Sequence, residues 1–178
     1  MYKKRTLLYS LIALLIFCSS FSVVAQANDS LLSQLTRKWK NSKAYALEIA
    51  EKMPAEFYPF KPVPEQMSFQ EQLLHIADNI QWLSSSFLFV EKNNLNDEKT
   101  EKNKAAVIKY LSDAYDMGIA AHQNIKANQL EDSVSFFSGP MTRRQIFILL
   151  HDHQSHHIGQ LIVYLRLKGI KPPGYVGW

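Results

Sequence analysis

Residues 142–169 read TRRQIFILLHDHQSHHIGQLIVYLRLKG, and apolar or histidine side chains recur through this stretch at steps of three and four. The series is Ile146, Leu150, His153, His157, Leu161 and Tyr164. Because an α-helix has about 3.6 residues per turn, these side chains share one face, which predicts an amphipathic helix with that face on the protein core. Thr142 can cap the start of this helix, and Gly169 can stop it after Lys168.

The same spacing predicts three more amphipathic helices earlier in the chain. The first covers residues 31–53. The second starts after Ser68, which can form a capping box with Glu71, and its apolar residues continue to Val90. The third covers residues 105–125.

Irregular segments are expected between these helices. Residues 54–64 contain four prolines, which fix the backbone and remove hydrogen-bond donors, and residues 91–104 and 128–140 are expected to form loops. The tail, residues 171–178, cannot be regular. Since no alternation of apolar and polar residues indicates a strand, the predicted fold class is all-α, a single four-helix bundle around one core.

The N-terminus has the layout of a secretory signal peptide. Three basic residues precede an apolar run over residues 7–17, and small and polar residues follow as far as Ala27. We therefore expect residues 1–27 to be a cleaved signal peptide and residues 28–178 to be the folded domain. The apolar run is shorter than the roughly 20 residues that span a bilayer, so no stable membrane insertion is expected after cleavage.

Cleavage would leave 151 residues without a thiol, because the one cysteine, Cys18, lies in the signal; the bulky Phe17 before it makes lipid attachment a minor alternative. With Lys3, Lys4 and Arg5 removed, 17 basic residues face 16 acidic ones, which gives no reason to expect nucleic-acid binding. Phosphate-binding loops and nucleophile-elbow motifs are missing from the sequence. We therefore expect an exported protein, in the periplasm in preference to the medium or the cell surface.

The histidines of the fourth helix are the main candidates for chemistry. His153 and His157 are one helical turn apart within the apolar face, where two imidazoles can hold one divalent ion while a third ligand comes from a facing helix. His75, on the second helix, is available as that third ligand. A buried imidazole is costly unless it is hydrogen-bonded, so hydrogen-bonded core histidines are the alternative interpretation.

Other polar groups of the same region compete with these three. Asp152 and His156 are also four residues apart and form a weaker candidate pair. His151 has no partner at such a spacing, and His122, among lysine and glutamine residues of the third helix, is expected on the solvated surface.

Four further residues have both a structural and a functional interpretation. Gln160 is either a helix-surface amide or a hydrogen-bonding group for a ligand histidine or a substrate, and Gly159 admits either a neighbouring helix or a ligand. Asp78 and Asn79, one turn from His75, could orient ligands or assist proton transfer, although solvated surface positions are expected for both.

The stretch HQSHHIGQ, residues 153–160, together with His75 in LLHIAD, residues 73–78, resembles the DinB/YfiT-like family of metalloenzymes. The resemblance extends over most of the predicted mature chain, including the proline-rich residues 58–64 and the Pro-Pro-Gly tail. Where the family often has arginine before the glycine of its signature, this chain has Ile158, which removes a group that could contact an anion.

The resemblance implies a four-helix bundle with a three-histidine site, His75, His153 and His157, for a divalent metal such as zinc or nickel. Some relatives use a low-molecular-weight thiol as a co-substrate. An exported protein lies in a compartment without a reducing thiol pool, so thiol transfer is not expected here.

The expected function is therefore an exported metal-dependent enzyme that performs hydrolysis or group transfer on a small molecule. The alternative is a non-catalytic metal-binding or structural bundle. A homodimer is expected only if Trp39, Trp82 or the aromatic loop leaves an exposed apolar patch.

Overall fold

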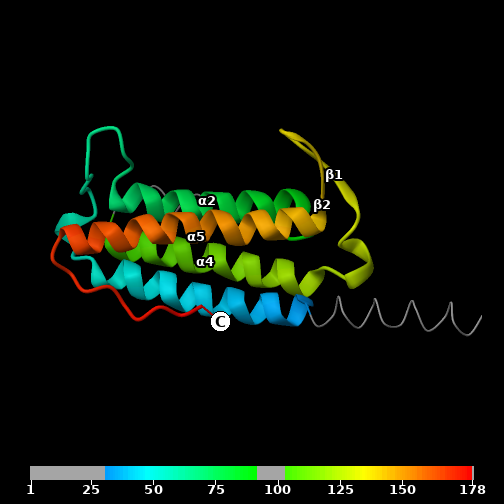
Figure 1. Ribbon diagram of the computed structural model, residues 1–178, viewed down its shortest axis with the longest axis horizontal. Helices are drawn as coiled ribbons and strands as arrows, with labels where there is room; N and C mark the ends of the chain where they lie inside the picture. The colour runs from blue at the N-terminus through cyan, green and yellow to red at the C-terminus, as the bar shows by residue number, and fades with distance from the viewer. Residues whose placement is uncertain (1–30, 92–102, 178) are drawn as a thin grey trace, which may run out of the picture.

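The computed structural model describes residues 31–91 and 103–177, and four helices lie side by side in it (Figure 1). The helices are an N-terminal helix over residues 31–52, α2 (Phe69–Phe87), α4 (Lys104–Asn124) and α5 (Arg143–Leu167). The shorter elements are the 3-10 turns η1 (Ala55–Phe57) and η2 (Ala127–Gln129) and the strands β1 (Ser133–Phe136) and β2 (Gly139–Thr142). The predicted four helices are confirmed, whereas the predicted signal peptide, residues 1–27, lies outside the described residues.

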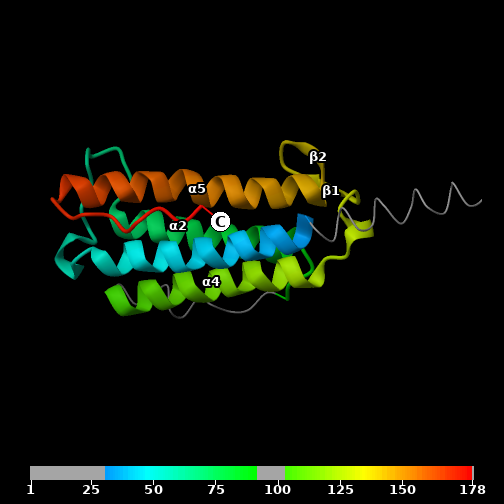
Figure 2. The same ribbon diagram turned by 60° about the horizontal axis from the view of Figure 1, so that its bottom comes forward.

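The direction of the helices determines which side chains meet. The N-terminal helix and α5 run one way along the bundle, and α2 and α4 run the other way (Figures 1 and 2). Helix α2 packs against both α4 and α5. Side chains of α2 therefore face those of α5 across an antiparallel contact.

Local sequence signals determine where the helices begin. Ser68 accepts a hydrogen bond from the backbone of Glu71, whose carboxylate accepts one from the backbone of Ser68, so the predicted capping box is confirmed. Thr142 and Gln145 form a second capping box at the start of α5. The predicted cap is again confirmed. It determines where α5, the helix that carries His153 and His157, begins.

A two-stranded hairpin corrects the expectation that no strand is present. β1 and β2 pair antiparallel, with Phe136 opposite Gly139, in a segment predicted to be a loop. Gly139 has a φ of +117°, which strongly favours glycine and allows the tight reversal. The sequence SVSF of β1 does alternate, but over four residues only, which is too short to distinguish from a loop by its pattern.

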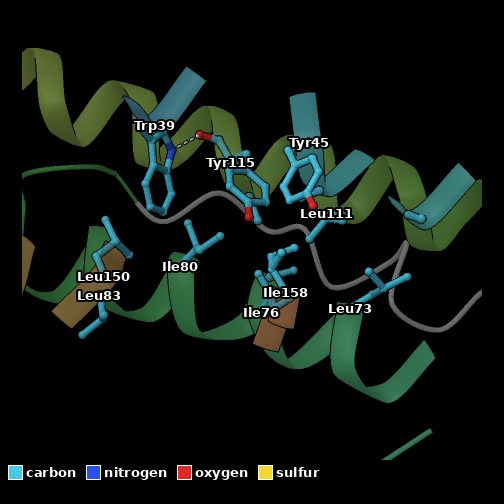
Figure 3. Packing of buried hydrophobic residues seen from close by; sticks show 14 of the residues in the cluster. Trp39, Tyr45, Leu73, Ile76, Ile80, Leu83, Leu111, Tyr115, Leu150 and Ile158 are labelled. Atoms are coloured by element: carbon cyan, nitrogen blue, oxygen red, sulfur yellow. Dashed lines mark hydrogen bonds between the residues drawn. The ribbon is translucent and has the colours of Figure 1, made fainter. Parts of the chain in front are cut away.

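Trp39 of the N-terminal helix lies in the core beside Tyr115 (Figure 3) and contacts residues of α4 and α5. Its indole is fully buried and its Nε1 donates a hydrogen bond of 3.0 Å to the carbonyl of Tyr115 on α4. The same indole stacks on His122 of α4 and contacts the ring of His151 on α5 edge-on. A Cβ at Gly118 would lie 2.4 Å from the indole, so only glycine leaves room for this contact.

Aromatic exposure differs among the residues considered for a dimer contact. Trp39 is buried and therefore cannot contribute to one, whereas Trp82 is 40% exposed and Phe137 is 85% exposed, and their rings stack. The dimer stays a prediction.

No helix among the described residues is long and apolar enough to cross a membrane.

Candidate metal centre

Three histidines from two helices converge at the contact between α2 and α5. His75 lies on α2, His153 and His157 lie one turn apart on α5, and each offers a ring nitrogen within 4.8 Å of the others. The Nε2 atoms of His75 and His153 are 3.1 Å apart. Two nitrogens that bind one tetrahedral zinc at about 2.0–2.1 Å lie roughly 3.3 Å from each other, so the observed spacing fits a shared ion.

The protonation state of the α5 pair suits metal binding. Burial lowers the pKa of His153 to about 4, with smaller contributions from the neighbouring His75 and His156. Burial also lowers the pKa of His157 to about 4, and His153 and His75 add to the effect. Neutral imidazole is the form that coordinates a metal, so both side chains are in the required state at neutral pH.

A hydrogen-bond chain fixes the orientation of His157. Its Nδ1 lies 2.5 Å from Oε1 of Gln72, whose Nε2 lies 2.5 Å from Oε1 of Gln160. The Nε2 of Gln160 continues the chain to Nε2 of His156, at 2.7 Å. Because an amide oxygen only accepts, Nδ1 of His157 carries its proton and its Nε2 lone pair is left to bind an ion.

The hydrogen-bond chain contains one residue, Gln72, to which the sequence analysis gave no role. Gln72 is 1% exposed and lies three residues before His75, on the face that α2 turns to α5. A glutamine three residues from a candidate ligand, on the same helix face, is the sequence signal that could have identified it. The hydrogen-bonding interpretation of Gln160 agrees with its place in the chain.

A cleft of about 410 Å³ opens beside His75. Its walls come from the proline-rich connector and from α2, and they consist of Lys61, Glu65, Gln66, Met67, Glu71, Leu74, His75 and Asp78. Asp78 accepts a hydrogen bond of 2.6 Å from the hydroxyl of Tyr110 on α4. Asp78 is half-buried and its carboxylate is held at the wall of the cleft, so the expected solvated surface position is met only in part.

The predicted surface position of His122 is also wrong. His122 is 3% exposed, and its Nδ1 donates to the carbonyl of Gly118 at 2.7 Å. Its Nε2 lies 3.1 Å from Nε2 of His151, which gives His151 the partner that was not expected. The lysine and glutamine neighbours of His122 suggested a solvated side chain. His122 lies four residues after Gly118, however, and therefore on the same face of α4, which packs on Trp39 in the core. Within residues 31–91 and 103–177 no third metal ligand joins His122 and His151, which form a hydrogen-bonded pair in the core.

Two other candidates from the sequence take different positions. Asp152 and His156 are exposed, and His156 bonds to Gln160 instead of forming a site with Asp152. Nothing lies within 4 Å of a Cβ placed on Gly159, so this glycine does not serve close helix packing. It lines a smaller cleft, of about 220 Å³, between α5, the N-terminal helix and the C-terminal tail.

Comparison with known proteins gives relatives of the same architecture. YjoA of Bacillus subtilis (strain 168), an uncharacterized protein, is 25% identical over 141 residues, which cover 77% of this chain and 90% of YjoA. The crystal structure of that DinB-like protein matches with a TM-score of 0.65 and 24% identity, over 80% of this chain and 96% of its own.

A DinB-like protein from Bacillus cereus ATCC 10987 has a crystal structure that matches with a TM-score of 0.65 at 18% identity, over 80% of this chain and 95% of its own. Both solved structures share the fold. The model of the DinB family matches residues 25–177. This match takes in all four helices and the three histidines, and the chain belongs to the DinB family.

Proposed function

We propose that this protein is an exported metal-dependent enzyme that holds a divalent ion, zinc or nickel, through His75, His153 and His157, and performs hydrolysis or group transfer on a small molecule. The convergence of three imidazole nitrogens within 4.8 Å of one another supports this proposal most directly. The lowered pKa values of His153 and His157 add to it, because both rings are neutral and ready to coordinate.

The donor set is that of a catalytic rather than a purely structural site. Three protein nitrogens leave a coordination position for water or substrate, whereas structural zinc sites are closed by four protein ligands. A bound divalent ion would supply Lewis acidity, which lowers the pKa of a coordinated water toward about 7 or polarises a carbonyl.

The cleft that His75 lines is the route that we propose for a small molecule to this position. Its volume, about 410 Å³, lies within the range of small-ligand sites. Asp78 lines the cleft one turn from His75, as do Glu65 and Glu71 elsewhere on its wall, and we assign Asp78 as the proton acceptor because Tyr110 holds its carboxylate in place. Burial, and then the hydrogen bond to Asp78, raise the pKa of Tyr110, so its hydroxyl stays protonated and orients the carboxylate.

A structural role for the ion is the alternative, and the packing of α2 argues against it. Leu73, Ile76 and Ile80 of α2 are buried in the core and hold the helix without an ion. The bond between Gln72 and Gln160 joins α2 to α5 as well. These contacts join α2 to α5 in the absence of an ion, which supports a site that handles a substrate.

Residues 1–27 support export to the periplasm, and the near-neutral charge of the remaining chain gives no support for a nucleic-acid partner. The test is removal of the ion with a chelator, followed by circular dichroism, urea unfolding and a screen of ester, amide and thiol-transfer substrates. An enzyme keeps its fold and loses turnover, which returns with zinc or nickel. Loss of folding stability on chelation, with no turnover in the loaded form, would support the structural alternative.

A further inference from the structure

Two buried polar atoms near the three-histidine site have no hydrogen-bond partner among the described residues. They are Nδ1 of His153 on α5 and Oδ1 of Asn79 on α2. When the Nε2 of a histidine binds an ion, its Nδ1 carries the proton and becomes a donor. An amide oxygen is an acceptor, so the two unpartnered atoms are complementary.

The antiparallel contact of α2 and α5 places these residues opposite each other. Gln72 bonds to Gln160 across the contact. Seven residues make about two helical turns and return to the same face. Moving seven residues forward along α2 from Gln72 gives Asn79, and moving seven residues back along α5 from Gln160 gives His153. His75 lies between Gln72 and Asn79 along α2, and its ring contacts the rings of both His153 and His157.

We infer that Asn79 is a positioning residue, whose Oδ1 accepts the Nδ1–H of His153 when the ion binds at the site of the proposed function. Its role matches that of Gln72, whose Oε1 already accepts from Nδ1 of His157. The two amides flank His75 on α2, three residues before it and four residues after it. Helix α2 thus supplies one ligand and an orienting acceptor for each ligand of α5.

This arrangement makes Nε2 the coordinating atom of both α5 histidines. A second hydrogen bond on a ligand histidine fixes its ring orientation and tautomer, and its loss typically costs 10–100-fold in metal affinity. The sequence analysis expected Asn79 at the solvated surface. Its buried Oδ1 contradicts that expectation and is accounted for by this role.

The experiment measures zinc affinity by competition with a chromophoric chelator for the full protein and three variants. Asn79→Leu removes the acceptor at similar size, and Asn79→Asp keeps an acceptor oxygen. Gln81→Leu is the matched control, because it removes an amide of α2 that interacts with Tyr110 of α4 instead of α5. We expect Asn79→Leu to bind zinc 10–100-fold more weakly, and Asn79→Asp and Gln81→Leu to stay within about threefold of the parent.

Long-range ¹H–¹⁵N NMR of the histidine rings provides a readout that does not depend on a variant's folding. In the zinc-loaded parent, His153 and His157 should both carry their proton on Nδ1 and coordinate through Nε2. Equal zinc affinity of Asn79→Leu and the parent, or coordination of His153 through Nδ1, would overturn the inference and leave the proposed site intact. A parent that binds no zinc or nickel would overturn both.

Discussion

Replacement of Gly118 by alanine tests the packing by which Trp39 joins the N-terminal helix to α4 and α5. In an unobstructed helix this change is stabilising, because alanine is favoured over glycine by about 0.8–1.0 kcal/mol. Here the added Cβ would lie 2.4–2.5 Å from three atoms of the Trp39 indole. The indole is fully buried and bonded to the carbonyl of Tyr115, so it has little room to move.

Overpacking of a buried site costs about 1–3 kcal/mol, and a contact this short belongs at the upper end of that range. After subtraction of the gain in helix propensity, Gly118→Ala should destabilise the fold by roughly 1–2 kcal/mol, or by about 3–6 °C in Tm for a domain of this size.

Gly159→Ala is the matched control, because Gly159 is also inside a helix but nothing lies within 4 Å of its added Cβ. This variant should gain about 0.5–1 kcal/mol. Urea unfolding followed by tryptophan fluorescence and thermal unfolding followed by circular dichroism measure both values. The reasoning is refuted if Gly118→Ala is as stable as Gly159→Ala.

Three further predictions follow from the core and the helix start. Burial lowers the pKa of His122 from 6.5 to about 4 in the fold. Between these pH values this side chain is protonated only in the unfolded chain, so His122 should contribute a fall in stability of about 3 kcal/mol as the pH drops from 6.5 to 4, in addition to the contributions of His153 and His157. Urea titrations across this range should show a smaller fall for His122→Asn, and an unchanged fall would contradict the assignment. Tyr115→Phe removes the 2.9 Å hydrogen bond to buried Gln154, so the free energy of unfolding measured in urea should fall by about 1–3 kcal/mol. An unchanged free energy of unfolding would contradict this prediction. Thr142→Ala removes the cap of α5 and should lower Tm by an amount equivalent to about 1 kcal/mol, whereas no change would mean that the capping box does not contribute.

The sequence predicted the helices well because their signals are local. Apolar spacing and the capping residues Ser68 and Thr142 act within a few neighbouring positions, and each is found where it was expected. The hairpin at residues 133–142 escaped prediction, because strands of four residues are too short for a reliable pattern. Its formation depends on tertiary contacts such as those of Phe136 with Trp82.

The site was only partly predictable, for a related reason. The spacing of His153 and His157 indicated a shared helix face, and His75 on the second helix was available as the third ligand, a set that the resemblance to the family also implies. Gln72 and the buried pair of His122 and His151 depend on contacts between residues far apart in the chain. Neighbouring polar residues suggested a solvated His122, but packing of α4 against Trp39 overrides that local signal.

The measurement that tests the central claim most directly is elemental analysis of the protein, expressed with its own N-terminus and purified without a histidine tag, beside the His153→Ala/His157→Ala variant. The account predicts about one zinc or nickel ion per chain in the parent and none in the variant, because the ring nitrogens of the three histidines lie within 4.8 Å of one another and can share a single ion. Mass spectrometry of the same sample reports whether residues 1–27 have been removed. Absence of metal from a folded parent, or equal metal content in the variant, would contradict the account.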